Sequence, residues 1–441
     1  MKSIFWFRQD LRTFDNSWLT KAFENSSEIL PIFILDKNIL ERFPQNDKRL
    51  GFLKDALIKL DQELQSLGSF LLVKIWKPEE IIPQLVQEYQ IEKVFCNKSY
   101  WNYGTQRDSK IKSLINADFE SFEDFFLINP YDVPVRKVFT PFFKQWKPLI
   151  NFEWFSQIKW KIKSPNIQIQ DINAIFENIS YWENKYWDVY GWDKILSKFD
   201  FCNYWETRNL PYIDGTSKLS PYTRFWLVSV RQIYDAIKKS DCDDEIFLSE
   251  IAWREFWNHI MINFPWTEDL EFLEKRRWIA WQNDEKLFNA WKEWKTGYPL
   301  VDAGMRQLKE ENWIHNRVRM VVASFLTKDL LIDRRWWERY FEDYLIDYDR
   351  NVNIWNWQWA ASVWADPKPL RIFNPMLQSQ RFDPNCDYIK KYIPELKNYE
   401  PGQIHNPLRY NLSYAKPVID HFENSKLAKE LYSNASRPNL E

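Results

Sequence analysis

The sequence predicts a two-part chain, with an α/β N-terminal domain of the Rossmann-like parallel-sheet type and an all-α C-terminal domain. Short apolar runs alternate with helical spacing over the first 130 residues, and the pattern is helical almost throughout from about residue 196. A chain of 441 residues also exceeds the length of one ordinary core. We therefore expect an α/β domain at 1–130, a connector at 131–195 and a helical domain at 196–441.

The N-terminal segment shows two periodicities. Apolar runs at 4–7, 29–35, 70–73 and 93–96 are typical of buried strands. Between them, leucines recur at helical spacing from Leu50 to Leu67, and Gly68 should end that helix. Residues 79–89 predict another helix, which Pro83 should distort. Alternating strands and helices imply a parallel sheet with helices on its faces.

Glycine is scarce, with 8 residues in the whole chain and no GxGxxG in the α/β segment. A dinucleotide on a glycine-rich turn is therefore not expected there and would have to bind elsewhere.

The later segments differ in pattern from the α/β segment. Residues 131–195 mix aromatic side chains with prolines, as a connector would. Beyond them, Ile251, Phe256, Ile260 and Phe264 fit one face of an amphipathic helix.

Charge, cysteine and tryptophan content narrow the function classes. The net charge is -2, so any nucleic-acid affinity must come from a local basic patch. The four cysteines, Cys96, Cys202, Cys242 and Cys386, match no metal spacing, and we expect reduced thiols in a cytoplasmic protein. Neither a signal peptide nor a membrane span is predicted, and we expect a monomer. The 26 tryptophans indicate either aromatic packing or a role in stacking and electron transfer.

A hydroxyl-rich turn follows Asp214-Gly215. It consists of Thr216, Ser217, Lys218, Leu219 and Ser220. Hydroxyls and a lysine before a helix can cradle a phosphate, because backbone N–H groups at a helix N-terminus favour anions. Serine and threonine also cap helices of every kind, so a plain cap is the alternative.

Charged and aromatic side chains share a face around Glu250. Glu250 and Arg254 are four positions apart, which allows an ordinary salt bridge. Trp253 beside them would instead make a mixed aromatic and ionic surface that suits a base-like ligand.

A second polar group lies between residues 313 and 359. Asn316 and Met320 are four positions apart on one helical face. Arg317 follows Asn316 directly, and Arg319 directly precedes Met320. Further along stand Asp347, Asp349, Asn353, Trp357 and Trp359. No third ligand at suitable spacing accompanies the two aspartates, so a metal site is not expected.

These motifs resemble those of the cryptochrome/photolyase family, and within it the class I (microbial-type) cyclobutane pyrimidine dimer DNA photolyases. The runs 5–12 and 137–142 are similar to the family's opening strand and connector, so the resemblance covers nearly the whole chain. It implies a flavoprotein lyase, a deoxyribodipyrimidine photolyase. The implied reaction splits dimers in UV-damaged DNA by electron transfer from excited, reduced FAD, which the segment 196–441 would bind. A second, antenna chromophore is left open, although Gly104 stands where folate-binding members often have Glu.

The resemblance also implies residue roles. Catalysis and electron transfer would fall to Glu250, Asn353, Trp357 and Trp281. The cofactor would contact Tyr204, Thr216, Ser217, Lys218, Leu219, Ser220, Phe247, Glu250, Arg254, Asn316, Arg319, Asp347, Asp349 and Asn353. The substrate and its DNA would contact Arg208, Trp253, Arg317, Met320, Trp359 and Arg371.

Two positions favour dimer repair. Photolyases for 6-4 photoproducts carry His where Asn316 stands, and Asn353 matches the residue that faces flavin N5 in photolyases. A cryptochrome-like photoreceptor without repair activity is the alternative on the same scaffold. A non-enzymatic nucleic-acid binder that stacks bases on aromatics is a third reading.

The implied tryptophan chain has a gap. Trp357 matches its first member and Trp281 its exposed last member, but Arg334 occupies the middle position. Trp336, Trp337 and Trp355 lie nearby, and we expect a branch through Trp336 or Trp355.

Overall fold

The computed structural model describes residues 1–43, 47–151, 158, 161, 163–240, 242, 245–365 and 370–435, with only the backbone of Trp337. The chain divides into two compact units. Unit 1 comprises Met1–Pro134, Gln145–Phe199 and Lys218–Asp241, and unit 2 comprises Val135–Lys144, Asp200–Ser217 and Cys242–Glu441. Most of the expected connector thus belongs to unit 1, while the domain boundaries at 130 and 195 stay a prediction.

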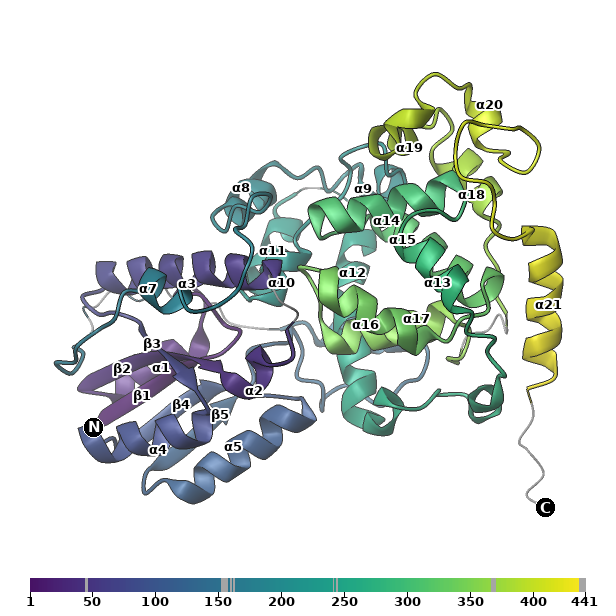
Figure 1. Ribbon diagram of the computed structural model, residues 1–441. Helices are drawn as coiled ribbons and strands as arrows, with labels where there is room; N and C mark the ends of the chain where they lie inside the picture. Colours follow the sequence, from purple (N-terminus) through teal and green to yellow (C-terminus); the bar gives the residue numbers. More distant parts are fainter. Residues whose placement is uncertain are drawn as a thin grey trace, which may run out of the picture. The chain divides into compact units, whose positions relative to one another are not determined.

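Unit 1 is built on a five-stranded parallel sheet in the order β3-β2-β1-β4-β5 (Figure 1). The strands are β1 (Lys2–Phe7), β2 (Glu28–Asp36), β3 (Leu72–Trp76), β4 (Lys93–Asn97) and β5 (Asp118–Phe122). The expected Rossmann-like sheet is confirmed, although β3 begins two residues later than the apolar run at 70–73 indicates. Ile4 of β1 pairs with Leu30 on one side and with Val94 on the other, which fixes the central register.

Helices cover both faces of this sheet, which explains why its central strands are continuous apolar runs. The helices among the strands are α1 (Ser17–Asn25), α2 (Lys37–Leu40), α3 (Lys48–Ser66), α4 (Pro78–Tyr89) and α5 (Asn102–Leu114). Figure 1 shows α3 on the opposite side of the sheet from α4 and α5. Gly68, with φ +82°, follows the end of α3 as expected, and Pro83 lies inside α4 without dividing it.

The remaining helices of unit 1 come from later in the chain. They are α7 (Ile172–Phe176), α8 (Gly191–Lys198), α10 (Ser220–Arg224) and α11 (Val230–Lys238), with the 3-10 turn η1 (Lys147–Leu149). Buried ion pairs join α11 to the loop between β1 and α1 and to the segment after β5: Arg231 donates to Asp15 and to Asp124, 2.9 and 2.6 Å away. These pairs tie α11 to segments 216 and 107 residues earlier in the sequence and so join them into one unit.

Unit 2 is helical, and no strand occurs in its described residues. Its elements are α6 (Phe139–Trp146, mostly in this unit), α9 (Tyr204–Thr207), α12 (Glu245–Asn263), η2 (Pro265–Glu268), η3 (Glu274–Trp278), α13 (Glu285–Lys292), α14 (Pro299–Glu311), α15 (Asn316–Ser324), the π-helical turn η4 (Phe325–Asp329), α16 (Arg334–Tyr344), α17 (Arg350–Ala360), α18 (Pro375–Phe382), α19 (Asp387–Tyr392), η5 (Pro394–Leu396), α20 (Pro401–Ile404) and α21 (His421–Ser433). The predicted helical C-terminal part is confirmed.

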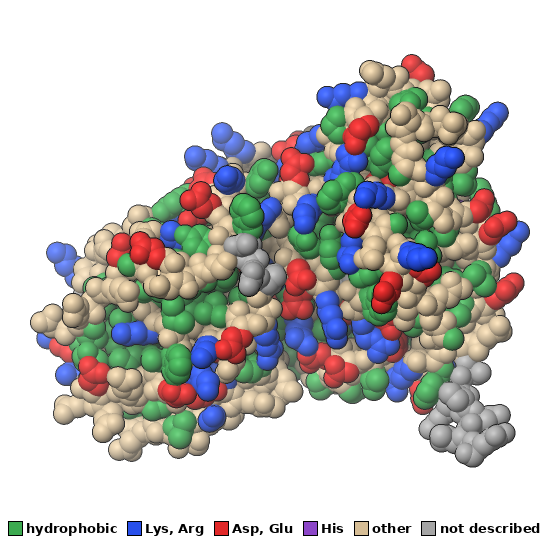
Figure 2. Space-filling model, in the orientation of Figure 1, with side chains coloured by type: hydrophobic (Ala, Val, Ile, Leu, Met, Phe, Trp, Pro, Cys, Tyr) green, Lys and Arg blue, Asp and Glu red, His purple; other side chains and the backbone are tan. Residues whose placement is uncertain are grey.

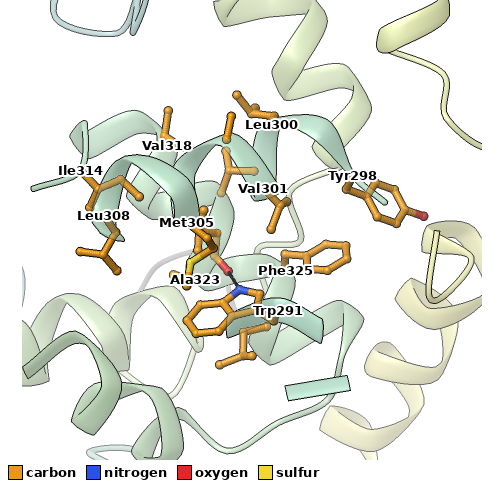
Figure 3. Packing of buried hydrophobic residues seen from close by; sticks show 14 of the residues in the cluster. Trp291, Tyr298, Leu300, Val301, Met305, Leu308, Ile314, Val318, Ala323 and Phe325 are labelled. Atoms are coloured by element: carbon orange, nitrogen blue, oxygen red, sulfur yellow. Dashed lines mark hydrogen bonds between the residues drawn. The ribbon is translucent and has the colours of Figure 1, made fainter. Parts of the chain in front are cut away.

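Trp291 lies within the main core of unit 2 (Figure 3). Its side chain is fully buried against residues of α14 and α15, including Met305. Its indole N–H donates to the backbone carbonyl of Val322, 3.4 Å away. This core holds α14, α15 and α17 together and so fixes the side chains that α15 and α17 carry.

A disulfide joins Cys202 to Cys242, whose Cα atoms are 5.4 Å apart. The expectation of four reduced thiols is wrong for this pair, because a separation of 40 residues matches no motif that sequence reasoning recognises. Cys96 and Cys386 are buried free thiols. Within the described residues, no helix has both the length and the apolar character that a membrane span requires.

Candidate functional site

Asn353 and Trp357 form a buried polar pair on α17. Asp349 caps this helix by accepting a hydrogen bond from the N–H of Val352, so Asn353 and Trp357 fall one turn apart on one face. The indole N–H of Trp357 donates to Oδ1 of Asn353 across 2.8 Å, and both side chains are buried. The amide Nδ2 of Asn353 is also buried, and no described residue accepts a hydrogen bond from it. A buried donor without a partner is costly, which points to a ligand acceptor at this place.

α15 packs against α17 and presents a second unpartnered donor. Arg319 lies 3.4 Å from Asp347, and its Nε is buried without an acceptor among the described residues. Asn316 is exposed at the start of α15, and Met320 is partly buried one turn later. Asp347 therefore holds Arg319, whereas Asp349 serves as the cap of α17.

Glu250 on α12 pairs with Arg208, which follows α9. The Nη1 of Arg208 is 2.6 Å from Oε1 of Glu250, and each side chain keeps about a third of its surface exposed, at 30% and 33%. Burial raises the pKa of Glu250 above its usual value, and the charge of Arg208 opposes that rise. The i, i+4 geometry with Arg254 did not identify this partner, because Arg208 lies 42 positions away.

Aromatic rings support the Glu250–Arg208 pair. Tyr204 and Phe247 meet edge to face with centroids 4.9 Å apart, and the guanidinium of Arg208 lies 5.6 Å above the ring of Tyr204. The expected cofactor residues Tyr204 and Phe247 thus lie beside the expected catalytic Glu250.

Two expected substrate-contacting tryptophans are partly exposed. Trp253 is stacked on Phe139, with centroids 3.6 Å apart and planes 6° apart. The guanidinium carbon of Arg371 lies 5.4 Å from the ring centroid of Trp359. Phe139 is a contact that we missed, although its segment was singled out as a motif. Its aromatic character alone did not reveal that it would cover Trp253.

Arg317 was expected to face phosphate, and the structure places it in a more crowded setting. It donates to Oδ1 of Asn209 from Nε and Nη2, at 3.1 and 2.7 Å. Its guanidinium also lies 4.4 Å from the ring centroid of Phe382 on α18. Burial lowers the pKa of Arg317, and the charges of Arg208 and Arg381 lower it further.

The hydroxyl-rich turn spans the division between the two units, with Thr216 and Ser217 in unit 2 and Lys218 to Ser220 in unit 1. Lys218 has φ +51°, a left-handed conformation, and α10 begins at Ser220. Because α10 has only 5 residues, its dipole is small. A phosphate here would rely on hydroxyl and backbone N–H donors, and the cradle stays a prediction.

Arg334 is fully buried at the gap in the tryptophan chain. It pairs with Glu338 at 2.8 Å and with Glu271 at 3.6 Å. Trp281 lies in a separate small cluster against Tyr432, with centroids 5.9 Å apart. Trp281 is partly exposed there, and its role as the last member of the tryptophan chain stays a prediction.

Another aromatic series leads away from Trp357. Its ring meets Phe341 at 5.0 Å, Phe341 meets Trp291 at 6.0 Å, and Phe288 meets both Trp291 and Trp336, at 5.9 and 5.4 Å. Trp336 is partly exposed. Trp355 instead contacts Trp257 and Trp364. No group of three or more potential metal ligands occurs in the described part of the chain.

Comparisons with known proteins match both parts of the chain. Residues 3–157 match a family model described as DNA photolyase, and residues 247–434 match the FAD binding domain of DNA photolyase. The deoxyribodipyrimidine photo-lyases of a Synechococcus strain and of Alkalihalophilus pseudofirmus are 34% and 35% identical, covering 98% and 97% of this chain and 96% and 97% of theirs.

Solved structures show the same likeness. An archaeal photolyase from Sulfolobus tokodaii, described with two FAD molecules, has a TM-score of 0.89 at 30% identity, covering 98% of this chain and 100% of its own. A class III photolyase from Agrobacterium tumefaciens has a TM-score of 0.88 at 31% identity, covering 98% and 97%. A Synechocystis cryptochrome also has a TM-score of 0.88, at 26% identity, covering 98% and 99%. The fold alone therefore does not distinguish a photolyase from a cryptochrome.

Proposed function

The chain belongs to the DNA photolyase family, and from that premise we propose that it splits cyclobutane pyrimidine dimers in DNA, using blue or near-UV light. The class I assignment and the dimer substrate are parts of this proposal. The single observation that carries it is the pair of unpartnered buried donors, Nδ2 of Asn353 and Nε of Arg319, beside Trp357 and Asp347.

FAD is the cofactor of this family, and the residues present fit it. When bound and reduced, FAD supplies the light-excited electron that breaks the bonds between the two bases. Asn353 would donate its free amide hydrogens to the edge of the flavin. Arg319, held by Asp347, would place the positive charge of its guanidinium nearby. Buried rings such as Trp357 would exclude water from that edge.

Glu250 would act on the dimer. A carboxyl group whose pKa is raised is protonated more readily, and a protonated carboxyl can donate a hydrogen bond to a carbonyl that becomes negatively charged. Arg208 would position Glu250 and keep a positive charge close to the same carbonyl. Trp253, Met320 and Trp359 would pack on the dimer once it is extruded from the duplex, which costs a few kcal/mol of unstacking, least at a damaged site.

The alternative is a cryptochrome-like photoreceptor that keeps FAD and lacks repair. Its support is the equal fold similarity to the Synechocystis cryptochrome. The full set of Glu250, Trp253, Met320 and Trp359 favours repair, because signalling alone does not require a dimer pocket.

Substrate discrimination tests this proposal. Purified protein with chemically reduced FAD should restore the bases of an oligonucleotide that carries a thymine dimer, in light and not in the dark. It should leave a 6-4 photoproduct in the same sequence unchanged. Repair of the 6-4 photoproduct alone would mean that Asn316 does not set the substrate, and a stable photoreduced flavin with no repair of either lesion would favour the photoreceptor.

A further inference from the structure

A disulfide adjoins the Glu250 side of the candidate site. Cys202 lies just before α9, Cys242 lies just before α12, and their sulfur atoms are bonded. Tyr204 is the first residue of α9, and Glu250 lies on α12, so each helix carries an expected site residue. The bond therefore ties the starts of these two helices together within unit 2.

α9 depends on its surroundings for its position. It has four residues, and no side chain in the described part of the chain caps its N-terminus by a hydrogen bond. A single helical turn does not persist by itself, because helix nucleation is unfavourable. The rings of Tyr204 and of Phe201, which precedes the helix, each meet the ring of Phe247 with centroids 4.9 Å apart. The disulfide adds a covalent attachment at this same end of α9.

The other end of α9 lies against the hydroxyl-rich turn. The hydroxyl of Thr207 donates to the carbonyl of Gly215, 3.3 Å away, and a Cβ on Gly215 would collide with the Cβ of Thr207. Residues 216–217 of the expected phosphate cradle follow directly. Arg208, next after α9, pairs with Glu250. A displacement of α9 would therefore disturb the cradle and the Glu250 pair together.

The disulfide is the thiol chemistry of this chain that a reagent can reach. Cys202 is exposed and Cys242 is partly exposed, whereas the free thiols of Cys96 and Cys386 are buried. Burial raises the pKa of Cys96 to about 11 and that of Cys386 to about 12, so both stay protonated near neutral pH. Thiol–disulfide exchange requires access and a thiolate. Exchange is therefore directed to Cys202 and Cys242.

Dithiols are the reagents that fit this bond. The sequence predicts a cytoplasmic protein, and disulfides in that compartment are usually transient and either catalytic or redox-sensing. The chain carries a net charge of -2, and on the face in Figure 2 acidic and basic side chains are interspersed. Such a charge distribution neither attracts nor repels a charged thiol strongly over a long range. Access to Cys202 thus matters more for the exchange than the charge of the reductant.

We propose that Cys202 and Cys242 form a site of reversible exchange with dithiols, and that the oxidation state of this pair sets the affinity for FAD. A thiolate of the dithiol attacks Sγ of Cys202, and the bond to Cys242 breaks with its electron pair on Cys242, which takes up a proton. The second thiol of the reductant then displaces Cys202 from the mixed disulfide. Two electrons and two protons have passed to the protein, which leaves two cysteine thiols and the oxidised reductant.

The inference deepens the proposed function, because it rests on the roles proposed there for the cofactor and for Glu250. A cross-link that constrained only the unfolded chain would change stability and leave the affinity of the folded protein for FAD unchanged. A cross-link that also holds α9 in the folded protein reduces the ordering that FAD binding must impose on the site. The oxidised protein should therefore bind FAD more tightly than the reduced protein.

The first experiment measures FAD binding in the dark. Protein stripped of FAD is titrated with oxidised FAD, once as isolated with the disulfide intact and once after treatment with a dithiol, at a temperature where circular dichroism shows both forms folded. The reduced form should bind roughly three- to tenfold more weakly, the cost of ordering about one further side chain or turn. Equal affinities of the two forms would overturn the inference.

A double variant provides the matched control. Cys202→Ser combined with Cys242→Ser keeps Cys96 and Cys386, so it separates the disulfide from the other thiols. It should bind FAD like the reduced protein and should not respond to dithiol. A dithiol effect of the same size in this variant would assign the effect to another group and contradict the proposal.

The second experiment uses the reciprocity of linked equilibria. If the disulfide strengthens FAD binding, FAD must stabilise the disulfide by the same factor. The reduction potential of the pair is measured in dithiol buffers by alkylating the thiols of Cys202 and Cys242, with and without saturating FAD. A tenfold coupling lowers the potential by about 30 mV when FAD is bound. A potential that FAD does not change would refute the coupling, and so would two free thiols in protein kept under air without reductant.

These results are separable from a failure of the proposed function, because neither experiment contains DNA or light. A protein that splits dimers but binds FAD equally in both oxidation states keeps the function and lacks the redox control. A protein that shows the coupling but repairs no dimer keeps the redox control and lacks the function.

Discussion

At the scale of single residues, the pairing of Glu250 with Arg208 determines what the candidate site can do. An isolated carboxylate would be a poor neighbour for a dimer that gains an electron, because the charges repel. The raised pKa of Glu250 and the adjacent cation of Arg208 both reduce that repulsion.

We predict that Glu250→Ala lowers the repair quantum yield while FAD stays bound. The lost hydrogen bond to a charged group is worth about 1.5–3 kcal/mol, so binding of dimer DNA should weaken by no more than roughly a hundredfold. Repair yield and flavin absorbance are measured on the same sample. An unchanged yield would leave Glu250 as a structural partner of Arg208 only.

The second residue-scale prediction concerns light-driven reduction of oxidised FAD. A guanidinium does not replace an indole as an electron donor, and Arg334 is held by Glu338 and Glu271. The contacts from Trp357 through Phe341 to Trp291, and then through Phe288 to Trp336, offer another path to solvent.

Trp336→Phe should therefore slow photoreduction strongly in the presence of an external thiol donor, whereas Trp281→Phe should barely affect it. Dimer repair with chemically reduced FAD should survive both changes. Complete loss of photoreduction in Trp281→Phe would show that the path through Trp281 is used after all.

Residue identities could be predicted from the sequence far better than residue partners. Asn353 and Trp357 are four apart on one helix, so their contact follows from helix geometry. The partners of Glu250, Trp253 and Arg317 come from other segments, and no local periodicity encodes them. Phe139 and Asn209 were missed for that reason.

At the scale of elements, the π-helical turn η4 places two charged side chains in the core. Lys328 and Asp329 are fully buried, and Lys328 donates a hydrogen bond to the carbonyl of Ala360 at the end of α17. Burial lowers the pKa of Lys328 from its ordinary 10.5 to about 7, partly opposed by Asp329. Asp329 itself bonds His421 at the start of α21.

This shift predicts a pH-dependent stability. The folded protein binds the Lys328 proton more weakly than the unfolded chain does. The folded state is therefore most stable above the unfolded pKa of 10.5, where Lys328 is neutral in both states. The free energy of unfolding decreases as pH falls from there towards about 7. The difference in thermal midpoint, Lys328→Met minus unchanged protein, should thus be largest near pH 6 and should shrink by about pH 9. Lys295→Met, at an exposed lysine, is the control and should show no such trend. A constant difference across this range would mean that Lys328 is not desolvated.

Strands and long helices were predictable, because a sheet covered on both faces requires continuous apolar runs and α3 repeats leucine at helical spacing. The turn η4 was not, since a π-helical turn leaves no signature in the spacing of Phe325 and Leu326. The start of β3 was misplaced because Phe70 and Leu71 are as apolar as the strand itself.

At the scale of the whole molecule, the Cys202–Cys242 disulfide closes a loop of 40 residues that passes through both units. In the chain-entropy account, a loop of that length stabilises the folded state by about 4 kcal/mol. Cys202→Ser should lower the free energy of unfolding by about that amount, and added thiol reductant should abolish the difference. Equal stabilities without reductant, with two free thiols found at Cys202 and Cys242, would mean that the pair is reduced in solution.

The central claim is that this chain repairs cyclobutane dimers with light, and the most direct measurement is the number of dimers split per photon absorbed. Protein with reduced FAD and saturating dimer-containing DNA should split dimers in proportion to the light dose, none in the dark, and keep its flavin reduced. A complex that binds the damaged DNA and absorbs light with reduced flavin, yet leaves every dimer intact, would contradict the account.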